Sequence, residues 1–409
     1  GDAASTIAHS SSTFVQLGSS TPSSVLHTLE YLVQKYYVHV HNADDFIVAF
    51  LPHHETFLFD RLLQLVDLAQ MPQWAFLRPY SAAVGVNGVP RTVIAKWAAS
   101  TKDNGGGTAV VKRVCSLAKR GGRIHALQRN LVGGDLSSTL EVRRGVSLFI
   151  SFAAAILAET FNIQHSANGS IQEATLRSVL PFILSAVEPN STNSRKKKKK
   201  QNWSLGAICP EWRAFGQVMI SLLVDKCELN SELCEGLSIG VLRGAKESIE
   251  IIQSADRESG VDIDGDMDME TSASVEAVLD LSSDAILSVM SLVLGNQIDG
   301  QEKGKDDFGI VSQLVMINSK DVPILGCNLS YPAFKSLMKL PHLAATLGYL
   351  SEEREIDIST LIGCVIAMTI DSCKRQKVKR KDRLQYIRVL SDMVRNHKFN
   401  NYTTQCSKK

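Results

Sequence analysis

Histidines and aspartates gather near the start of the chain, in a group whose spacing could bind a metal ion. The group comprises His39, His41, Asp44, Asp45, His53 and His54. In metal-dependent hydrolases a His-x-His pair leaves a rigid strand, and further ligands return from other strands to complete the coordination. The alternation of side chains over residues 36–40 would suit such a strand. This group therefore raises the hypothesis of an enzyme that hydrolyses its substrate at a bound metal.

The residues that flank this group favour helices instead. Apolar residues before it recur at intervals of three and four, as on one face of a helix. They are Val25, Leu26, Leu29, Leu32, Val33 and Tyr36. We therefore predict antiparallel helices over residues 23–101, with His39 to Asn42 in or beside an interhelix turn. The metal hydrolase stays as the enzyme alternative, although no histidine accompanies Asp44 as the metallo-β-lactamase pattern requires.

Other catalytic and metal-binding motifs are missing from the sequence. There is no phosphate-binding loop, nucleophile elbow, zinc-protease helix or dinucleotide fingerprint. Counted from Asp262, Gly265 is fourth and Glu270 ninth, which does not fit the calcium loop of an EF-hand. The eight cysteines include no C-x-x-C pair, so we expect reduced thiols rather than a zinc ribbon or a disulfide framework. We predict no enzyme activity, no cofactor and no bound metal.

Composition and periodicity indicate an all-α protein. The chain has 409 residues, of which 44% are hydrophobic and 21% charged, as in ordinary folded proteins. Alternation typical of strands is almost confined to residues 36–40 and 261–269, and the apolar run 145–158 is too short for a membrane span. Later helices are predicted at 206–226, 231–253, 274–294, 332–350, 356–372 and 380–397. At this length we favour an α-solenoid of stacked helical hairpins over one bundle, and we expect no membrane partner.

Three Leu-Pro steps, at Pro52, Pro181 and Pro341, make the predicted hairpins HEAT-like. HEAT repeats often carry a kinking proline in their first helix and an aspartate at the start of the second, an arrangement that Pro52 and Asp60 resemble. Pro181 and Pro341 lack an aspartate at that distance, so repeats there would be degenerate. The alternative is an unrelated α protein with prolines at its helix ends.

Shifts in composition divide the chain into segments. We expect a disordered polar N-terminus at 1–22, HEAT-like helical repeats at 23–188, a basic linker at 189–203, a helical hairpin at 204–253, an acidic linker at 254–273 and further HEAT-like repeats at 274–409. Like charges as dense as those of the two linkers repel one another and stay solvated. We therefore predict that both linkers are mobile in isolation.

Two basic clusters supply the candidate binding residues, and the formal net charge of +2 hides them. One lies in the basic linker and the other leads into the last predicted helix. They consist of Arg195, Lys196, Lys197, Lys198, Lys199 and Lys200, and of Lys374, Arg375, Lys377, Lys379, Arg380, Lys381 and Arg383. Either cluster could contact RNA phosphates or an import receptor. The alternatives are a solvated loop for the first cluster and a solvated helix face for the second.

Residues 25–100 closely resemble a known protein family. The recognisable features are Leu29 to Tyr36, His41-Asn42-Ala43, Leu51-Pro52 and Phe57 to Leu65. They are similar to the N-terminal part of the U-three small nucleolar RNA-associated protein ten family, whose animal members are called HEAT repeat-containing protein one. These are large nucleolar HEAT-repeat proteins of the small-subunit processome. A looser likeness extends through residues 179–187 and 331–370, and because family members are much longer, we expect this chain to be an N-terminal portion.

The resemblance implies a non-catalytic scaffold in nucleolar ribosome biogenesis. Such a scaffold would support early pre-18S ribosomal RNA processing and assembly on the 5′ external transcribed spacer, coupled to ribosomal DNA transcription. The implied partners are the β-propeller proteins of the transcription-coupled subcomplex, pre-ribosomal RNA and the small nucleolar RNP. They would form a hetero-oligomeric assembly in the nucleus and nucleolus. A HEAT-repeat adaptor of another complex, such as nuclear transport, is the alternative among binding proteins.

Overall fold

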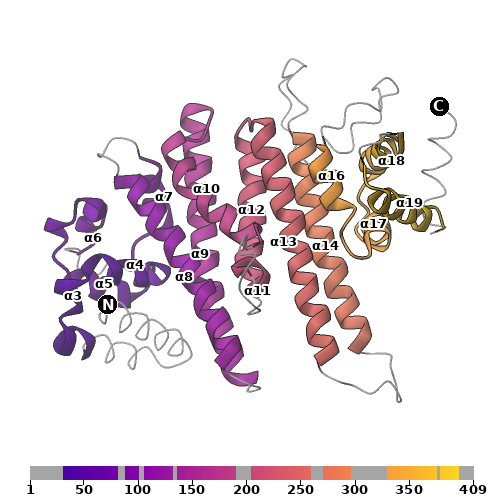
Figure 1. The fold of residues 1–409 in the computed structure, drawn as a ribbon. Helices are drawn as coiled ribbons and strands as arrows, with labels where there is room; N and C mark the ends of the chain where they lie inside the picture. Colours follow the sequence, from indigo (N-terminus) through magenta and orange to yellow (C-terminus); the bar gives the residue numbers. More distant parts are fainter. Residues whose placement is uncertain are drawn as a thin grey trace. The chain divides into compact units, whose positions relative to one another are not determined.

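The regular elements of this protein are helices wherever the structure describes it. The computed structural model describes residues 31–81, 88–100, 106–131, 136–189, 204–258, 270–295, 329–374 and 378–395 (Figure 1). This confirms the predicted all-α class. The predicted polar N-terminus, 1–22, and nearly all of the predicted basic linker, 189–203, lie outside the described residues.

Contacts divide the chain into two compact units. One contains residues 1–186 and 209–222, and the other contains 187–208 and 223–409. This division separates the predicted hairpin of 204–253, because most of its first helix belongs to one unit and its second helix to the other.

The first unit is built on helices packed in pairs. Its elements are α3 (Val38–His41), α4 (Ala43–Phe50), η2 (Leu51–His53), α5 (Phe57–Leu65), η3 (Leu68–Gln70), η4 (Pro72–Leu77), α6 (Arg78–Ser81), α7 (Arg91–Ala99), α8 (Gly106–Leu131), α9 (Leu136–Asn168), and most of α10 (Glu173–Val187) and α12 (Pro210–Lys226). Helices α8 and α9 pack along each other, and α7 packs against both. Ile94, Val114 and Ile156 are completely buried among them.

The second unit repeats the same plan. Its elements are α11 (Leu205–Ile208), α13 (Ser231–Glu258), α14 (Glu270–Gly295), α16 (Tyr331–Leu337), α17 (Leu343–Glu352), α18 (Ser359–Lys374) and α19 (Arg380–Arg395). Helix α13 packs along α14 and also contacts α16, while α14 contacts α17, and α19 contacts both α17 and α18 (Figure 1). Each hairpin thus buries its apolar face against the next, which is the packing principle of an α-solenoid of HEAT-like hairpins.

The three Leu-Pro steps take different forms. Helix α4 ends at Phe50, and Pro52 lies in the 3₁₀ turn η2, with Asp60 following in the first turn of α5. Pro181 lies inside α10. Pro341 lies between two separate helices. The residue after it, His342, has a left-handed φ of 54°, which a continuous α-helix cannot contain. The predicted helix 332–350 is therefore wrong as a single element, and α16 and α17 replace it.

Two further boundaries differ from the sequence-based expectation. The predicted helix 206–226 is divided at Cys209 into α11 and α12, because Pro210 begins the second helix. The predicted acidic linker, 254–273, is shortened from both sides. Helix α13 continues to Glu258 and α14 starts at Glu270, so its two ends are helical, while residues 259–269 lie outside the described residues.

One described helix tests the expectation about membranes. Ser147–Asn168, within α9, is long and apolar enough to cross a membrane. Half of its most apolar window is buried inside the protein, and Ile156, Leu157 and Phe161 are fully shielded from solvent. The core helix of a folded protein meets the same test of length and composition, so this helix is weak evidence for a membrane span.

Among the described residues, the cysteines are mostly buried or half-buried thiols. Cys115, Cys209, Cys227, Cys234 and Cys373 are free. Cys364 is disulfide-bonded, which corrects the expectation of reduced thiols throughout. That expectation rested on the absence of C-x-x-C pairs, and a disulfide does not require such a pair.

Candidate nucleic-acid interface

The histidine-rich stretch forms a helical corner, as predicted, and not a strand. The chain turns at Tyr37, whose φ of 49° is left-handed, and the single helical turn α3 follows. His54 is buried, and its Nδ1 donates to the carbonyl oxygen of Val89 at 2.6 Å. Gly88, with a φ of 74°, lies against the backbone of Glu55. A Cβ atom built on Gly88 would lie only 2.5 Å from the Cα of Glu55. His54 therefore links two segments of the chain, the one that contains it and the one that contains Val89.

The two aspartates of this stretch form hydrogen bonds and ion pairs with residues of other elements. Asp44 accepts a hydrogen bond of 2.6 Å from Trp74 Nε1 and forms an ion pair with Arg113 of α8. Asp45 lies 3.4 Å from Arg113 and 3.6 Å from Arg120. These contacts tie α4 to η4 and to α8. In the described part of the chain, no group of three or more His, Cys, Asp or Glu side chains could hold a metal ion.

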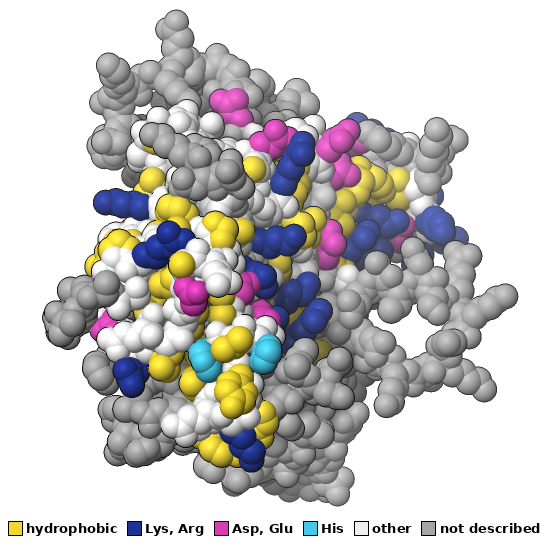
Figure 2. Space-filling view, turned by 90° about the vertical axis from the view of Figure 1, so that its left-hand side faces the viewer, with side chains coloured by type: hydrophobic (Ala, Val, Ile, Leu, Met, Phe, Trp, Pro, Cys, Tyr) yellow, Lys and Arg dark blue, Asp and Glu magenta, His cyan; other side chains and the backbone are white. Residues whose placement is uncertain are grey.

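Figure 2 shows one face of the molecule, on which Lys and Arg side chains lie close to Asp and Glu side chains. In the first unit, Arg113 and Arg120 of α8 pair with the aspartates of α4. These ion pairs offset part of the positive charge of α8.

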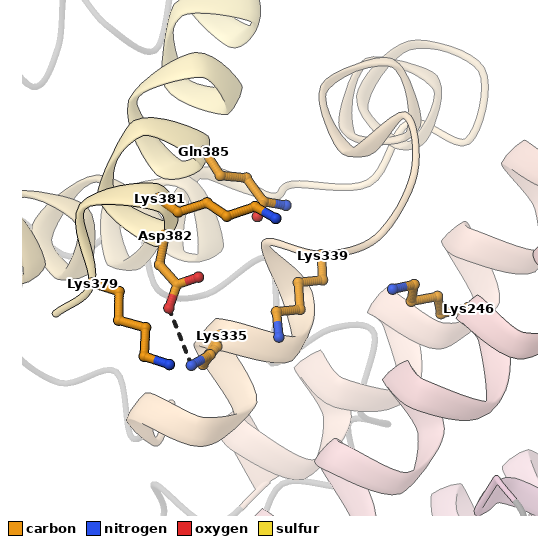
Figure 3. A pocket seen from close by; sticks show the side chains of 7 residues that line it. All are labelled: Lys246, Lys335, Lys339, Lys379, Lys381, Asp382 and Gln385. Atoms are coloured by element: carbon orange, nitrogen blue, oxygen red, sulfur yellow. Dashed lines mark ion pairs between the residues drawn. The ribbon is translucent and has the colours of Figure 1, made fainter.

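A different arrangement occurs in the second unit, where lysines from three segments line one pocket of about 450 Å³ (Figure 3). We call this pocket the lysine groove. Its lining residues are Lys246 of α13, Lys335 of α16, Lys339, Lys379, and Lys381, Asp382 and Gln385 of α19. A neighbouring pocket shares Lys246, Lys335 and Lys339 and adds Leu242, Arg243, Pro332 and Ser336. The lysine groove therefore continues along α13 and α16.

Charge is strongly unbalanced in the lysine groove. Its one lining carboxylate, Asp382, lies 3.2 Å from Lys335 Nζ and has a side chain only 19% exposed. Lys246 has a long contact of 3.6 Å with Glu250. The remaining lining lysines, Lys339, Lys379 and Lys381, are exposed and have no carboxylate within ion-pair distance among the described residues.

Local sequence explains why these lysines converge. Ser330 caps α16 by accepting from the backbone N–H of Ala333 at 3.3 Å, and α16 ends at Leu337. The chain then turns before Pro341, which leaves Lys339 exposed on the turn. Gln385 of α19 donates to the carbonyl oxygen of Met338 at 3.0 Å and ties the start of α19 to that turn.

An aromatic contact beneath the lysine groove fixes the same two helices. Tyr386 of α19 is fully buried against Phe334 of α16, with ring centroids 5.1 Å apart and planes nearly perpendicular. Burial raises the pKa of Tyr386. The lysines therefore project from a rigid base.

The predicted basic residues are only partly brought together. Lys379 and Lys381 line the lysine groove, whereas Lys374, Arg380 and Arg383 do not line it. Arg195 to Lys200, Arg375 and Lys377 lie outside the described residues. Sequence reasoning missed Lys246, Lys335 and Lys339. The four-residue spacing of the last two was a usable signal, whereas Lys246 lies too far away in sequence to give one.

The fold and the lysine groove together define a class of protein, a helical-repeat protein with a basic recess and with no metal cluster in its described part. No family model matches the chain. The chain is 25% identical to a HEAT repeat-containing protein 1 homolog of Caenorhabditis elegans over 39% of this chain and 8% of that protein. It is 22% identical to an uncharacterised protein of Arabidopsis thaliana over 54% of this chain and 8% of that protein.

These similarities agree with the fold. The matched part amounts to 8% of each relative's length, so the relatives are far longer than this chain. A distant HEAT-repeat relative and a fold of stacked helical hairpins both indicate a HEAT-type protein.

Proposed function

We propose that this chain is a non-catalytic scaffold of the small-subunit processome in nucleolar ribosome biogenesis. It would support early processing of pre-18S ribosomal RNA and assembly on the 5′ external transcribed spacer, in step with transcription of ribosomal DNA. Its partners would be the β-propeller proteins of the transcription-coupled subcomplex, pre-ribosomal RNA and the small nucleolar RNP, in the nucleolus.

The observation that carries this proposal is the series of stacked hairpins in each unit. Solenoids of this kind present long surfaces to several partners at once, and their stability comes from contacts between neighbouring hairpins. Two side chains with catalytic potential at the start of the chain have structural partners, since His54 contacts Val89 and Asp44 contacts Trp74. A scaffold role therefore uses what the fold provides.

Two lines of similarity support the particular assembly. Residues 25–100 resemble the N-terminal part of processome HEAT proteins, and the described portion of that range contains the turn at Pro52 followed by Asp60. The distant relative of C. elegans is named as a HEAT repeat-containing protein 1 homolog.

Affinity purification of the tagged protein from growing cells tests this proposal. We expect pre-ribosomal RNA containing the 5′ external transcribed spacer, together with β-propeller proteins, to be enriched over a tag-only control. A Leu62→Ala variant, which should unfold part of the first unit, is the matched control for loss of structure. Recovery of import receptors without pre-ribosomal RNA would favour a transport adaptor and contradict the proposal.

A further inference from the structure

We propose that the lysine groove binds the sugar–phosphate backbone of single-stranded RNA without reading its bases. This inference rests on the proposed function, because it names the surface through which the scaffold would touch its RNA. It assigns a role to Lys246, Lys335 and Lys339 together with Lys379 and Lys381.

The first argument is the charge that the protein itself leaves uncompensated. Five lysines line the lysine groove against one carboxylate, which is already engaged by Lys335. Lys339, Lys379 and Lys381 have no such partner among the described residues. Ammonium groups that share a recess repel one another, and a bound polyanion relieves this repulsion while releasing counterions.

The second argument is that these lysines do not serve the fold. Lys379 immediately precedes α19, and Lys381 lies in its first turn. Cations at this end of a helix interact unfavourably with the helix dipole. The stabilising contacts in this region come from Gln385, from Tyr386 and from the ion pair of Lys335 with Asp382, and none of them involves Lys339, Lys379 or Lys381. A basic cluster that costs stability is best explained by a ligand.

The third argument concerns shape. Figure 3 shows Lys335 and Lys379 extending toward each other, with Lys339 directed into the same space and Lys246 facing it from α13. A flexible single strand can bend a phosphate into such a recess. The phosphates of a duplex lie on a rigid convex surface and would reach only the rim, so we expect a preference for single strands.

The chemistry of the lining favours phosphates over an acidic peptide. The lining of the lysine groove itself is entirely lysine, aspartate and glutamine. Peptide recognition usually depends on apolar or aromatic anchors in desolvated pockets, and the seven lining residues of the lysine groove include none, whereas Leu242 and Pro332 belong to its continuation along α13 and α16. Lysine binds phosphate as a point charge, and without an aromatic platform the bases have nothing on which to stack. Binding should therefore be insensitive to sequence.

The test compares two triple variants of the full chain by fluorescence anisotropy with labelled oligouridine. One variant carries Lys339→Gln, Lys379→Gln and Lys381→Gln. The control carries Lys96→Gln, Lys112→Gln and Arg123→Gln, three exposed cations of the first unit. Circular dichroism melting checks that both variants fold like the wild type, which is expected because all six side chains are exposed.

The expected result is a change in salt dependence. Each phosphate contact on a single strand contributes about 0.7 to the slope of log K against log salt, so losing three contacts lowers the slope by about 2. Between about 50 and 200 mM salt the wild type should then lose roughly 20-fold more affinity than the groove variant. The control variant should keep the wild-type slope.

Three results would overturn the inference. The first is an unchanged slope in the groove variant, or an equal loss of slope in the control. The second is groove-dependent binding of a duplex as tight as that of oligouridine. The third is a polyglutamate peptide that displaces oligouridine and loses its own binding in the groove variant, since the site would then be one for an acidic protein.

Failure of this inference and failure of the proposed function give different results. If pre-ribosomal RNA co-purifies from cells while the groove variant binds oligouridine normally, the scaffold proposal stands and the groove assignment falls. If the groove variant loses oligouridine binding while pre-ribosomal RNA is not enriched from cells, the groove stands as an RNA site and the processome proposal falls.

Discussion

A glycine on α13 offers a sharp test of how the second unit packs. A Cβ atom at Gly244 would overlap the carbonyl oxygen of Val187, so a Gly244→Ala variant must push α13 away from this backbone. Backbone cannot move aside as the end of a flexible side chain can, and forcing extra volume into a packed contact costs about 1–3 kcal/mol.

The same helix contains its own control. Gly236 has no atom within 4 Å of a Cβ position, so Gly236→Ala should stabilise α13 by about 0.5–1 kcal/mol through helix propensity alone. Because both variants share that gain, their free energies of unfolding should differ by the overpacking cost, about 1–3 kcal/mol. Gly240 is intermediate, since a Cβ atom there would lie 3.1 Å from the flexible Cγ of Glu188.

Urea denaturation followed by circular dichroism measures the difference. We expect the midpoint to fall for Gly244→Ala and to rise for Gly236→Ala, with equal m-values. If Gly244→Ala is as stable as Gly236→Ala, α13 does not approach residue 187 as closely as the structure shows, and the packing argument for the second unit is refuted.

Three further outcomes are expected. Leu62→Ala, at a fully buried site, should destabilise the first unit by about 2–5 kcal/mol in urea denaturation, while His41→Ala at an exposed site should cost under about 0.5 kcal/mol; similar losses would contradict the assigned core. Burial, followed by the neighbouring His54, lowers the pKa of His53, so the folded state favours the neutral ring. The free energy of unfolding should therefore decline as the pH falls from the unfolded-state pKa of about 6.5 toward the lower pKa of the folded state. The His53→Gln variant should show a flatter decline, and an unchanged pH profile in that variant would argue against this account. Burial raises the pKa of the Cys115 thiol to about 12, so iodoacetamide should leave it unmodified in the folded protein, as peptide mass spectrometry would show; rapid alkylation would mean that the helix opens.

Much of the fold could be predicted because helical spacing is a local signal. The apolar stripe that includes Phe46, Ile47 and Phe50 is buried in α4. The histidines could be assigned to an interhelix corner because both flanks read as helix. Figure 1 and the left-handed φ at Tyr37 agree with this reading. Periodicity failed at Pro341, where the apolar spacing continues across a backbone break that depends on a left-handed His342.

The candidate site was less predictable, for a physical reason. Lys379 and Lys381 stood out because they belong to a dense local cluster. Lys246 reaches the same pocket only because α13 packs against α16. The spacing of residues within either helix does not predict that the two helices pack together. The partners of Asp44 were missed in the same way, since Trp74 and Arg113 come from other elements.

Crosslinking in living cells is the most direct measurement of the central claim, that this chain is a scaffold on pre-ribosomal RNA. Ultraviolet crosslinking of the tagged protein, stringent purification and sequencing of the attached RNA report direct contact. We predict reads concentrated in the 5′ external transcribed spacer, reduced in the Lys339→Gln, Lys379→Gln, Lys381→Gln variant. Reads distributed over cellular RNA in proportion to abundance, in the wild type as in a tag-only control, would contradict the claim.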